Sequence, residues 1–132
     1  MRRNLDLGLL VLRLSIGLLM LLHGLAKLSG LGFIKGMLSE AGLPAFIAYG
    51  VYLGEIVAPL LIIVGFRARL ATLVYVFNVL TAIFLVHSGD IFTLNQHGGW
   101  GIELLGLYLF GALTLFFTGA GKLSISSGNR WD

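Results

Sequence analysis

The segment Leu18–Leu28, LLMLLHGLAKL, places a histidine and a lysine four residues apart in an otherwise apolar stretch. It ends a longer apolar run at about 7–28, close to the roughly 20 residues that cross a bilayer as a helix. Three further runs of similar length follow, at about 45–65, 70–87 and 102–118. The sequence therefore predicts an all-α fold, a polytopic membrane protein built as a bundle of four transmembrane helices.

The composition supports the membrane assignment. Of the 132 residues, 58% are apolar and 11% are charged, whereas a soluble domain carries roughly 25% charged residues. The apolar runs use most of the chain, so we expect a single membrane domain over 1–132. The charged start, Met1-Arg2-Arg3, could also open a secretory signal peptide. Because the apolar run exceeds a signal core and no small-x-small cleavage site follows it, we expect it to remain as the first transmembrane helix.

The distribution of basic residues predicts the orientation in the membrane. In a four-span topology one side would carry Arg2, Arg3, Arg67, Arg69, Lys122 and Arg130. The other side would carry Lys27 and Lys35. Since basic loops are retained in the cytoplasm, both termini are predicted to be cytoplasmic. The net charge of +3 is thereby explained by topology and by anionic lipid headgroups, so no nucleic-acid partner is expected.

Two segments outside the spans also carry predictions. Residues 33–41, FIKGMLSEA, are either a short amphipathic helix in the membrane interface or a glycine-rich loop. The stretch 119–132 is a polar cytoplasmic tail, which we expect to be frayed.

Charged residues inside the predicted spans need partners or a function. A charge at the bilayer centre costs roughly 2.5–3.5 kcal/mol on insertion scales. Arg13 and Glu55 fall at similar predicted depths near the midplane, which predicts a buried ion pair. Such a pair could form the base of a pocket, or it could only fix the helix register.

Pro59 predicts a kink in the second span. Its ring clashes with the carbonyl four residues earlier, which belongs to Glu55, and it removes one helix hydrogen bond. Irregular backbone at membrane depth is tolerated only where protein, water or a ligand meets it. The region around Glu55 is therefore a candidate pocket.

A second polar group gathers toward the outer side and comprises His23, Lys27, His87 and Glu103. These titratable groups have access to water, as ligand binding or proton relay requires, and a purely structural role is the alternative. Adding His97 would give further metal-ligand types, but their spacing matches no ligand motif. No metal site is predicted.

The chain resembles the DoxX family through several motifs in register. The first is RLSIGLLMLLHGLAKL at 13–28, with an early arginine and an HG-x-x-K-L ending. The others are GLP at 42–44, GEIVAPLLIIVGFRARLA at 54–71, VH at 86–87, GGWGIELLGLYL at 98–109 and GAGKLSI at 119–125. The chain departs from the family at Ser124-Ile125-Ser126, where Ser-x-Asp is frequent.

The resemblance implies a four-helix protein of the bacterial inner membrane. Some relatives are subunits of quinone-linked oxidoreductases, others belong to redox-stress or quinone-resistance systems, and distant eukaryotic relatives are cargo receptors or chaperones. The matching positions in this chain are Arg13, His23, Gly24, Lys27, Glu55, Arg69, His87 and Glu103. The sequence has no cysteine and no haem, flavin or nucleotide motif, so no intrinsic cofactor is expected.

The leading interpretation is a membrane subunit that binds a quinone or similar lipid-soluble ligand and supports redox chemistry with a partner protein. His23, Lys27 or His87 would hydrogen-bond a ring oxygen. Glu103 would exchange protons, and Arg13–Glu55 would organise the base of the pocket. One alternative is a non-enzymatic, chaperone-like assembly or interaction protein whose buried charges hold the bundle together. Another is a small transporter, which would need to form a homo-oligomer. Whether the chain itself catalyses a reaction stays open, because family membership determines fold better than activity.

Overall fold

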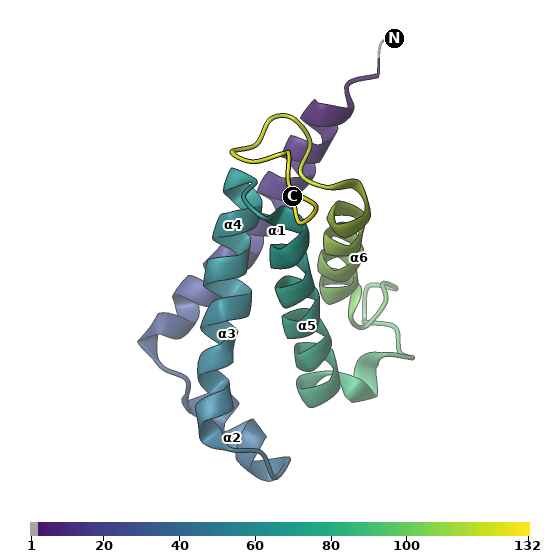
Figure 1. Cartoon of the computed structure of the whole chain (residues 1–132). Helices are drawn as coiled ribbons and strands as arrows, with labels where there is room; N and C mark the ends of the chain where they lie inside the picture. Colours follow the sequence, from purple (N-terminus) through teal and green to yellow (C-terminus); the bar gives the residue numbers. More distant parts are fainter. Residues whose placement is uncertain (1–2) are drawn as a thin grey trace.

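The computed structural model describes residues 3–132, and the described part is all-helical apart from one isolated β-bridge between Leu94 and Trp100 (Figure 1). Met1 and Arg2, the latter counted above in the charge asymmetry, lie outside the described residues. Four helical segments run up and down: α1 (Leu5–Ala26), a composite second segment (Ala45–Val64), α5 (Ala68–Val86) and α6 (Glu103–Thr118). The expected all-α fold is therefore confirmed, while the bundle of four transmembrane helices stays a prediction.

The second segment is composite because its local sequence changes helix type along its length. It consists of a 3₁₀ turn (Ala45–Tyr49), α3 (Gly50–Tyr52), a π-helical turn (Leu53–Val57) and α4 (Ala58–Val64). Pro59 lies in the first turn of α4, where a missing N–H is tolerated. The kink predicted at Pro59 stays a prediction, while a π turn that contains Glu55 lies directly before this proline.

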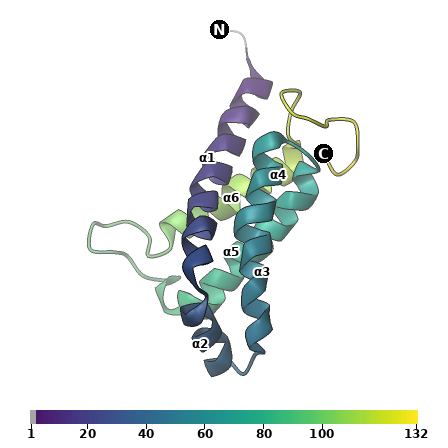
Figure 2. The ribbon, with the colours of Figure 1, turned by 90° about the vertical axis from the view of Figure 1, so that its left-hand side faces the viewer.

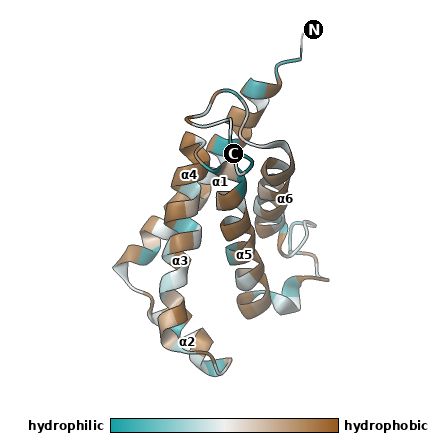
Figure 3. Cartoon of the chain, in the orientation of Figure 1, coloured by the Kyte–Doolittle hydropathy of each residue, from teal (hydrophilic) through white to brown (hydrophobic). Residues whose placement is uncertain are grey.

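Three helical stretches are long and apolar enough to cross a membrane: Leu5–Ser29, Ala45–Val64 and Ala68–Val86. Helix α6 has 16 residues, about 24 Å at 1.5 Å per residue, against a hydrocarbon core of roughly 30 Å. Hydrophobic residues dominate α4, α5 and α6, while the α3 part of the second segment is paler (Figure 3). The chain is thus a multi-pass membrane protein, and the fourth crossing by α6 stays a prediction.

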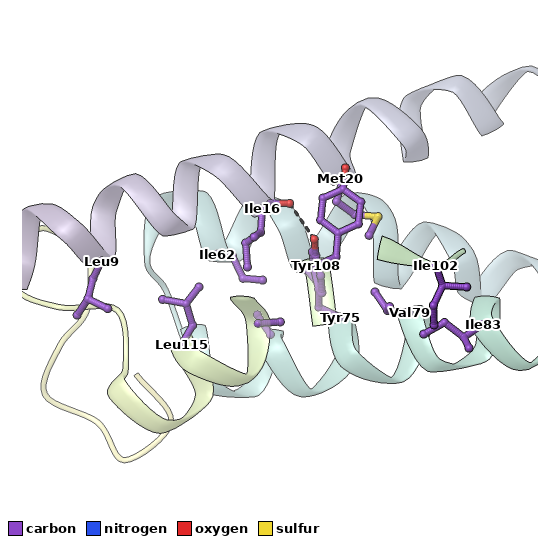
Figure 4. Close-up of a cluster of buried hydrophobic side chains, with 13 residues drawn as sticks. Leu9, Ile16, Met20, Ile62, Tyr75, Val79, Ile83, Ile102, Tyr108 and Leu115 are labelled. Atoms are coloured by element: carbon purple, nitrogen blue, oxygen red, sulfur yellow. Dashed lines mark hydrogen bonds between the residues drawn. The ribbon is translucent and has the colours of Figure 1, made fainter. Parts of the chain in front are cut away.

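Helix α5 lies at the centre of the core. Tyr75 and Val79 on α5, Ile62 on α4 and Leu115 on α6 are fully buried. The Tyr75 hydroxyl donates a 2.9 Å hydrogen bond to the backbone oxygen of Ile16, which ties α5 to α1 (Figure 4). The buried hydroxyl of Tyr75 therefore has a hydrogen-bond partner, as is usual for a tyrosine in a protein core.

Two glycines of α1 determine how it packs on the second segment. A methyl group at Gly24 would collide with the carbonyl oxygen of Glu55, and one at Gly17 would lie 3.2 Å from the carbonyl oxygen of Pro59. Small residues allow such close helix approach in membranes. The register of the two helices therefore places Gly24 opposite Glu55, and Gly17 opposite Pro59.

Helix α2 (Gly32–Glu40) decides between the two alternatives for residues 33–41 in favour of a helix. It forms a satellite core with the start of the second segment, in which Leu31, Leu38 and Ala48 are buried. This region, here called the α2 end of the bundle, lies away from both ends of the chain (Figures 1 and 2).

The tail is folded over the opposite end, here called the terminal end, so the prediction of a frayed tail is wrong. The backbone N–H groups of Ile125 and Ser126 donate to the carbonyls of Val64 and Gly65, each at 3.1 Å. The last carbonyls of a helix lack intrahelical donors, and here the tail supplies them. The N–H of Lys122 also donates to Asp6 Oδ1 at 2.9 Å. The start of α1 and the tail therefore lie at the same end of the bundle (Figure 1).

Candidate functional site

A cavity of about 580 Å³ opens at the α2 end between the helices. Its polar lining includes all four residues of the predicted outer cluster, together with Glu55, Asn78 and Tyr108: His23, Lys27, His87 and Glu103. Apolar side chains such as Met20, Met37 and Trp100 form much of the remaining wall. Residues from distant parts of the sequence therefore face one apolar space.

Lys27 and Glu55 form an ion pair in this cavity. Lys27 Nζ lies 2.5 Å from Glu55 Oε2, and Asn78 Nδ2 donates to Glu55 Oε1 at 3.2 Å. Glu55 is 5% exposed, while about one third of the Lys27 side chain is exposed. The carboxylate therefore has a partner on each oxygen, and the ammonium group keeps access to the cavity.

The π turn and Gly24 place Glu55 at this depth. Single π turns inside α-helices frequently occur at functional sites. The carbonyl of Glu55, for which Pro59 offers no N–H, packs against the backbone at Gly24. Protein thus covers this carbonyl, while the carboxylate pairs with Lys27, which also lines the cavity.

Arg13 does not meet Glu55, and the predicted ion pair between them is wrong. The guanidinium is 1% exposed and donates to four backbone carbonyls at the terminal end: Ile62 at 2.9 Å, Ile63 at 2.8 Å, Ala120 at 3.0 Å and Leu123 at 2.6 Å. Lys27, the partner of Glu55, follows 14 residues later in the chain, about 21 Å further at the α-helical rise of 1.5 Å per residue.

The error has a physical origin in the register. An Arg13–Glu55 pair requires that α1 and the second segment span the same layer. The first turn of the second segment, Ala45–Tyr49, instead contributes Ala48 to the satellite core with α2. Glu55 therefore lies level with the end of α1. Arg13 has no need of a carboxylate, because carbonyls at a helix C-terminus carry partial negative charge.

The four cluster residues share the cavity but not hydrogen bonds with one another. His87 Nδ1 lies 3.2 Å from Asp90 Oδ2. The carboxylate of Glu103 folds over Gly99, beside the amide of Asn95. The ring of His23 packs edge-on against Tyr108, with 6.1 Å between ring centroids. Within residues 3–132, no three histidine or acidic side chains are placed to hold a metal ion.

Tyr108 is a cavity residue that the sequence reasoning missed. The residue is 4% exposed, yet its hydroxyl forms no hydrogen bond with residues 3–132 and is not sealed in the core. The hydroxyl is therefore available to a molecule in the cavity. A tyrosine in the middle of an apolar span is the signal that could have identified it, since a buried hydroxyl usually has a partner.

Comparison with known proteins adds family information. A family model described as DoxX matches residues 8–88, which include His23, Lys27, Glu55 and His87. The chain is 28% identical over 109 residues to a protein of Bacillus subtilis (strain 168) named "Putative oxidoreductase CatD", covering 83% of this chain and 81% of that protein. No solved structure matches the chain.

Proposed function

Because the chain belongs to the DoxX family, we propose that this membrane protein binds a quinone-like, lipid-soluble ligand and supports redox chemistry with a partner protein. The observation that carries the proposal is the cavity of about 580 Å³ in which the Lys27–Glu55 pair faces apolar walls. Small-molecule sites typically have 300–1,000 Å³ of apolar space and a few polar groups. The name of the Bacillus subtilis relative supports an oxidoreductase setting.

The polar groups of the cavity suit a ligand with carbonyl oxygens on an apolar ring. Lys27 and the Tyr108 hydroxyl are donors, and His23 can donate from one ring nitrogen. Each would hold a ring oxygen, while Met20 and Met37 would contact the ring faces. Reduction of such a ligand would need electrons from a partner protein and protons from the solvent. Glu103, an exposed carboxyl at the cavity, would exchange those protons with water.

We also propose four membrane crossings in a bacterial inner membrane, with the terminal end in the cytoplasm. The start of α1 and the tail share one end of the bundle, which an even number of crossings requires. Arg67, Arg69 and Lys122 lie at that end, in agreement with retention of basic segments in the cytoplasm. The cavity would then open toward the opposite face.

Ligand-induced stabilisation tests the binding proposal. The purified protein in neutral detergent is titrated with a short-chain benzoquinone, and the unfolding temperature is recorded. Stabilisation rises with ligand concentration relative to the dissociation constant. His23→Leu and Tyr108→Phe should unfold near the parent temperature without ligand, because neither side chain hydrogen-bonds to residues 3–132. Both should respond less to the quinone.

Tyr49→Phe is the matched control, because Tyr49 lies outside the cavity lining. It should keep the full ligand response. An equal response in all variants, or none in the parent at saturating quinone, would overturn the proposal. Marked destabilisation of His23→Leu with an intact response would make that histidine a structural residue.

One observation favours the alternative of an assembly or interaction protein. Among residues 3–132, no buried polar side-chain atom lacks a hydrogen-bond partner. The buried charges of Arg13 and Glu55 are thus balanced within the bundle and need no ligand. In that case the protein would purify with a stoichiometric protein partner and without an extractable quinone.

A further inference from the structure

We propose that the terminal end of the bundle contains a second site, which binds a phosphate group supplied by an anionic phospholipid. A cavity of about 410 Å³ lies there, at the opposite end from the quinone site. It is lined by the start of α1, by Arg69 of α5 and by the segment after α6 with the tail. Neither the family match nor the ligand cavity accounts for it.

Three cations line this cavity, and they are Arg69, Lys122 and Arg130. Their charged groups form no hydrogen bond or ion pair with residues 3–132, and Arg130 only stacks on the ring of Trp131 at 5.0 Å. The two other arginines nearby differ, since Arg13 donates to four carbonyls and Arg67 pairs with Asp132. Three cations are therefore free for an anion.

The carboxylates in the lining already have partners within the protein. Asp132 accepts from Arg67 at 2.9 Å, from Ser126 at 2.6 Å and from the Asn129 N–H at 2.7 Å. Asp6 accepts from the Lys122 N–H. Among the side chains, with Arg67 included, four cations face two carboxylates, so the side chains around the cavity carry a net positive charge. Arginine in particular matches the oxygens of a phosphate.

The shape of the cavity favours a lipid over a free ion. Leu5, which is 68% exposed, and the buried Leu9 form an apolar wall beside the cations. An acyl chain can follow this wall while the phosphate meets the charges. The Arg69 guanidinium lies along the loop at Gly119, where an added methyl group would be 3.5 Å from Nε. Gly119 has a φ of 80°, a backbone conformation that favours glycine, so the loop can pass close to the Arg69 side chain only with glycine at this position.

The test compares ligands and variants of the whole chain in neutral detergent. Phosphatidylglycerol, phosphatidylcholine and inorganic phosphate are titrated separately, and binding is followed by unfolding temperature and native mass spectrometry. Phosphatidylglycerol should stabilise the parent, and phosphatidylcholine should not. Arg69→Gln and Arg130→Gln should each weaken phosphatidylglycerol binding about tenfold, as expected for loss of a charged hydrogen bond.

Arg3→Gln is the matched control, since it removes the same charge near the start of α1 but lies outside the lining. It should bind within about twofold of the parent, because diffuse surface charge contributes little at moderate salt. Equal losses in Arg3→Gln and Arg69→Gln would overturn the site, as would no preference for phosphatidylglycerol. Competition by millimolar inorganic phosphate would support the phosphate site and assign it to free phosphate. If Arg69→Gln does not fold, the exposed Arg130 alone decides the outcome.

Discussion

Lys27 Nζ and Glu55 Oε2, from two antiparallel segments, meet at 2.5 Å in the wall of the larger cavity. Asn78 of α5 donates a hydrogen bond to the other carboxylate oxygen, so the first segment, the second segment and α5 all contribute to the environment of this carboxyl group. The pair therefore links the packing of the bundle to the site where we propose that the ligand binds.

Breaking this pair should destabilise the ligand-free protein. Lys27→Met should lower the free energy of unfolding by about 1–3 kcal/mol, less than the 3–5 kcal/mol of a fully buried pair, because Lys27 is partly exposed. Adding Glu55→Gln should recover part of that loss, since no unpaired charge remains. The free energies of unfolding of the parent, the two single variants and the double variant are measured by denaturant unfolding in detergent. Lys35→Met, which removes an ammonium group that meets Tyr49, is the control and should change little. Strictly additive losses would show that the two charges are not coupled.

Arg13→Leu should destabilise the protein by about 3 kcal/mol or more, because four carbonyls lose their donor. Arg13→Lys should recover little, since an ammonium group cannot reproduce the planar fork. Urea unfolding and protease sensitivity of the tail are the measurements. The loss should be independent of Glu55→Gln, because the two sites lie at opposite ends. Rescue of Arg13→Leu by that second change would contradict the separation seen here.

A methyl group at Gly24 should force α1 away from the second segment. Gly24→Ala collides with the Glu55 carbonyl, and backbone cannot move aside as a side chain can. We expect a loss of about 1–3 kcal/mol, typical of overpacking, and a disturbed Lys27–Glu55 pair. Gly8→Ala is the matched control on the same helix, where nothing lies within 4 Å of the added group. It should leave stability unchanged or raise it slightly, since alanine favours a helix. Equal thermal stability of the two variants would argue against close packing at Gly24.

Acid should release the tail from the terminal end. Hydrogen bonds from Ser126 and Asn129, together with Arg67, lower the pKa of Asp132 to about 2 from its ordinary value of 3.8. A lowered carboxyl pKa means that the stabilisation is complete above the ordinary value and disappears as the pH falls toward 2. In a Trp100→Phe background, the fluorescence of Trp131 reports on the tail. It should change between about pH 4 and pH 2, and Asp132→Asn should remove this transition. A transition that persists in Asp132→Asn would assign it to another group.

The local sequence was sufficient to identify the helices. Apolar runs predicted at about 45–65 and 70–87 correspond to Ala45–Val64 and Ala68–Val86, within two residues at each end. Such runs carry the signal because bilayer thickness imposes a minimum length on a helix whose backbone must bond internally. The membrane class and the members of the polar cluster followed from the same local information. The length of α6, 16 residues, left its crossing open.

The pairing of the buried charges was decided by the tertiary structure. The sequence places two cations, Arg13 and Lys27, and two carboxylates, Glu55 and Glu103, in or near the spans. Which of them lie at the same depth depends on the register in which neighbouring helices pack. That register is set by contacts distant in sequence: Gly24 against Glu55, and the first turn of the second segment against α2. The same applies to the tail, whose polar composition suggested fraying. Its N–H groups bond to the open carbonyls at the end of α4 because the fold brings them together. Composition and periodicity determine which residues avoid lipid, and the packing of backbone against backbone decides which of them meet.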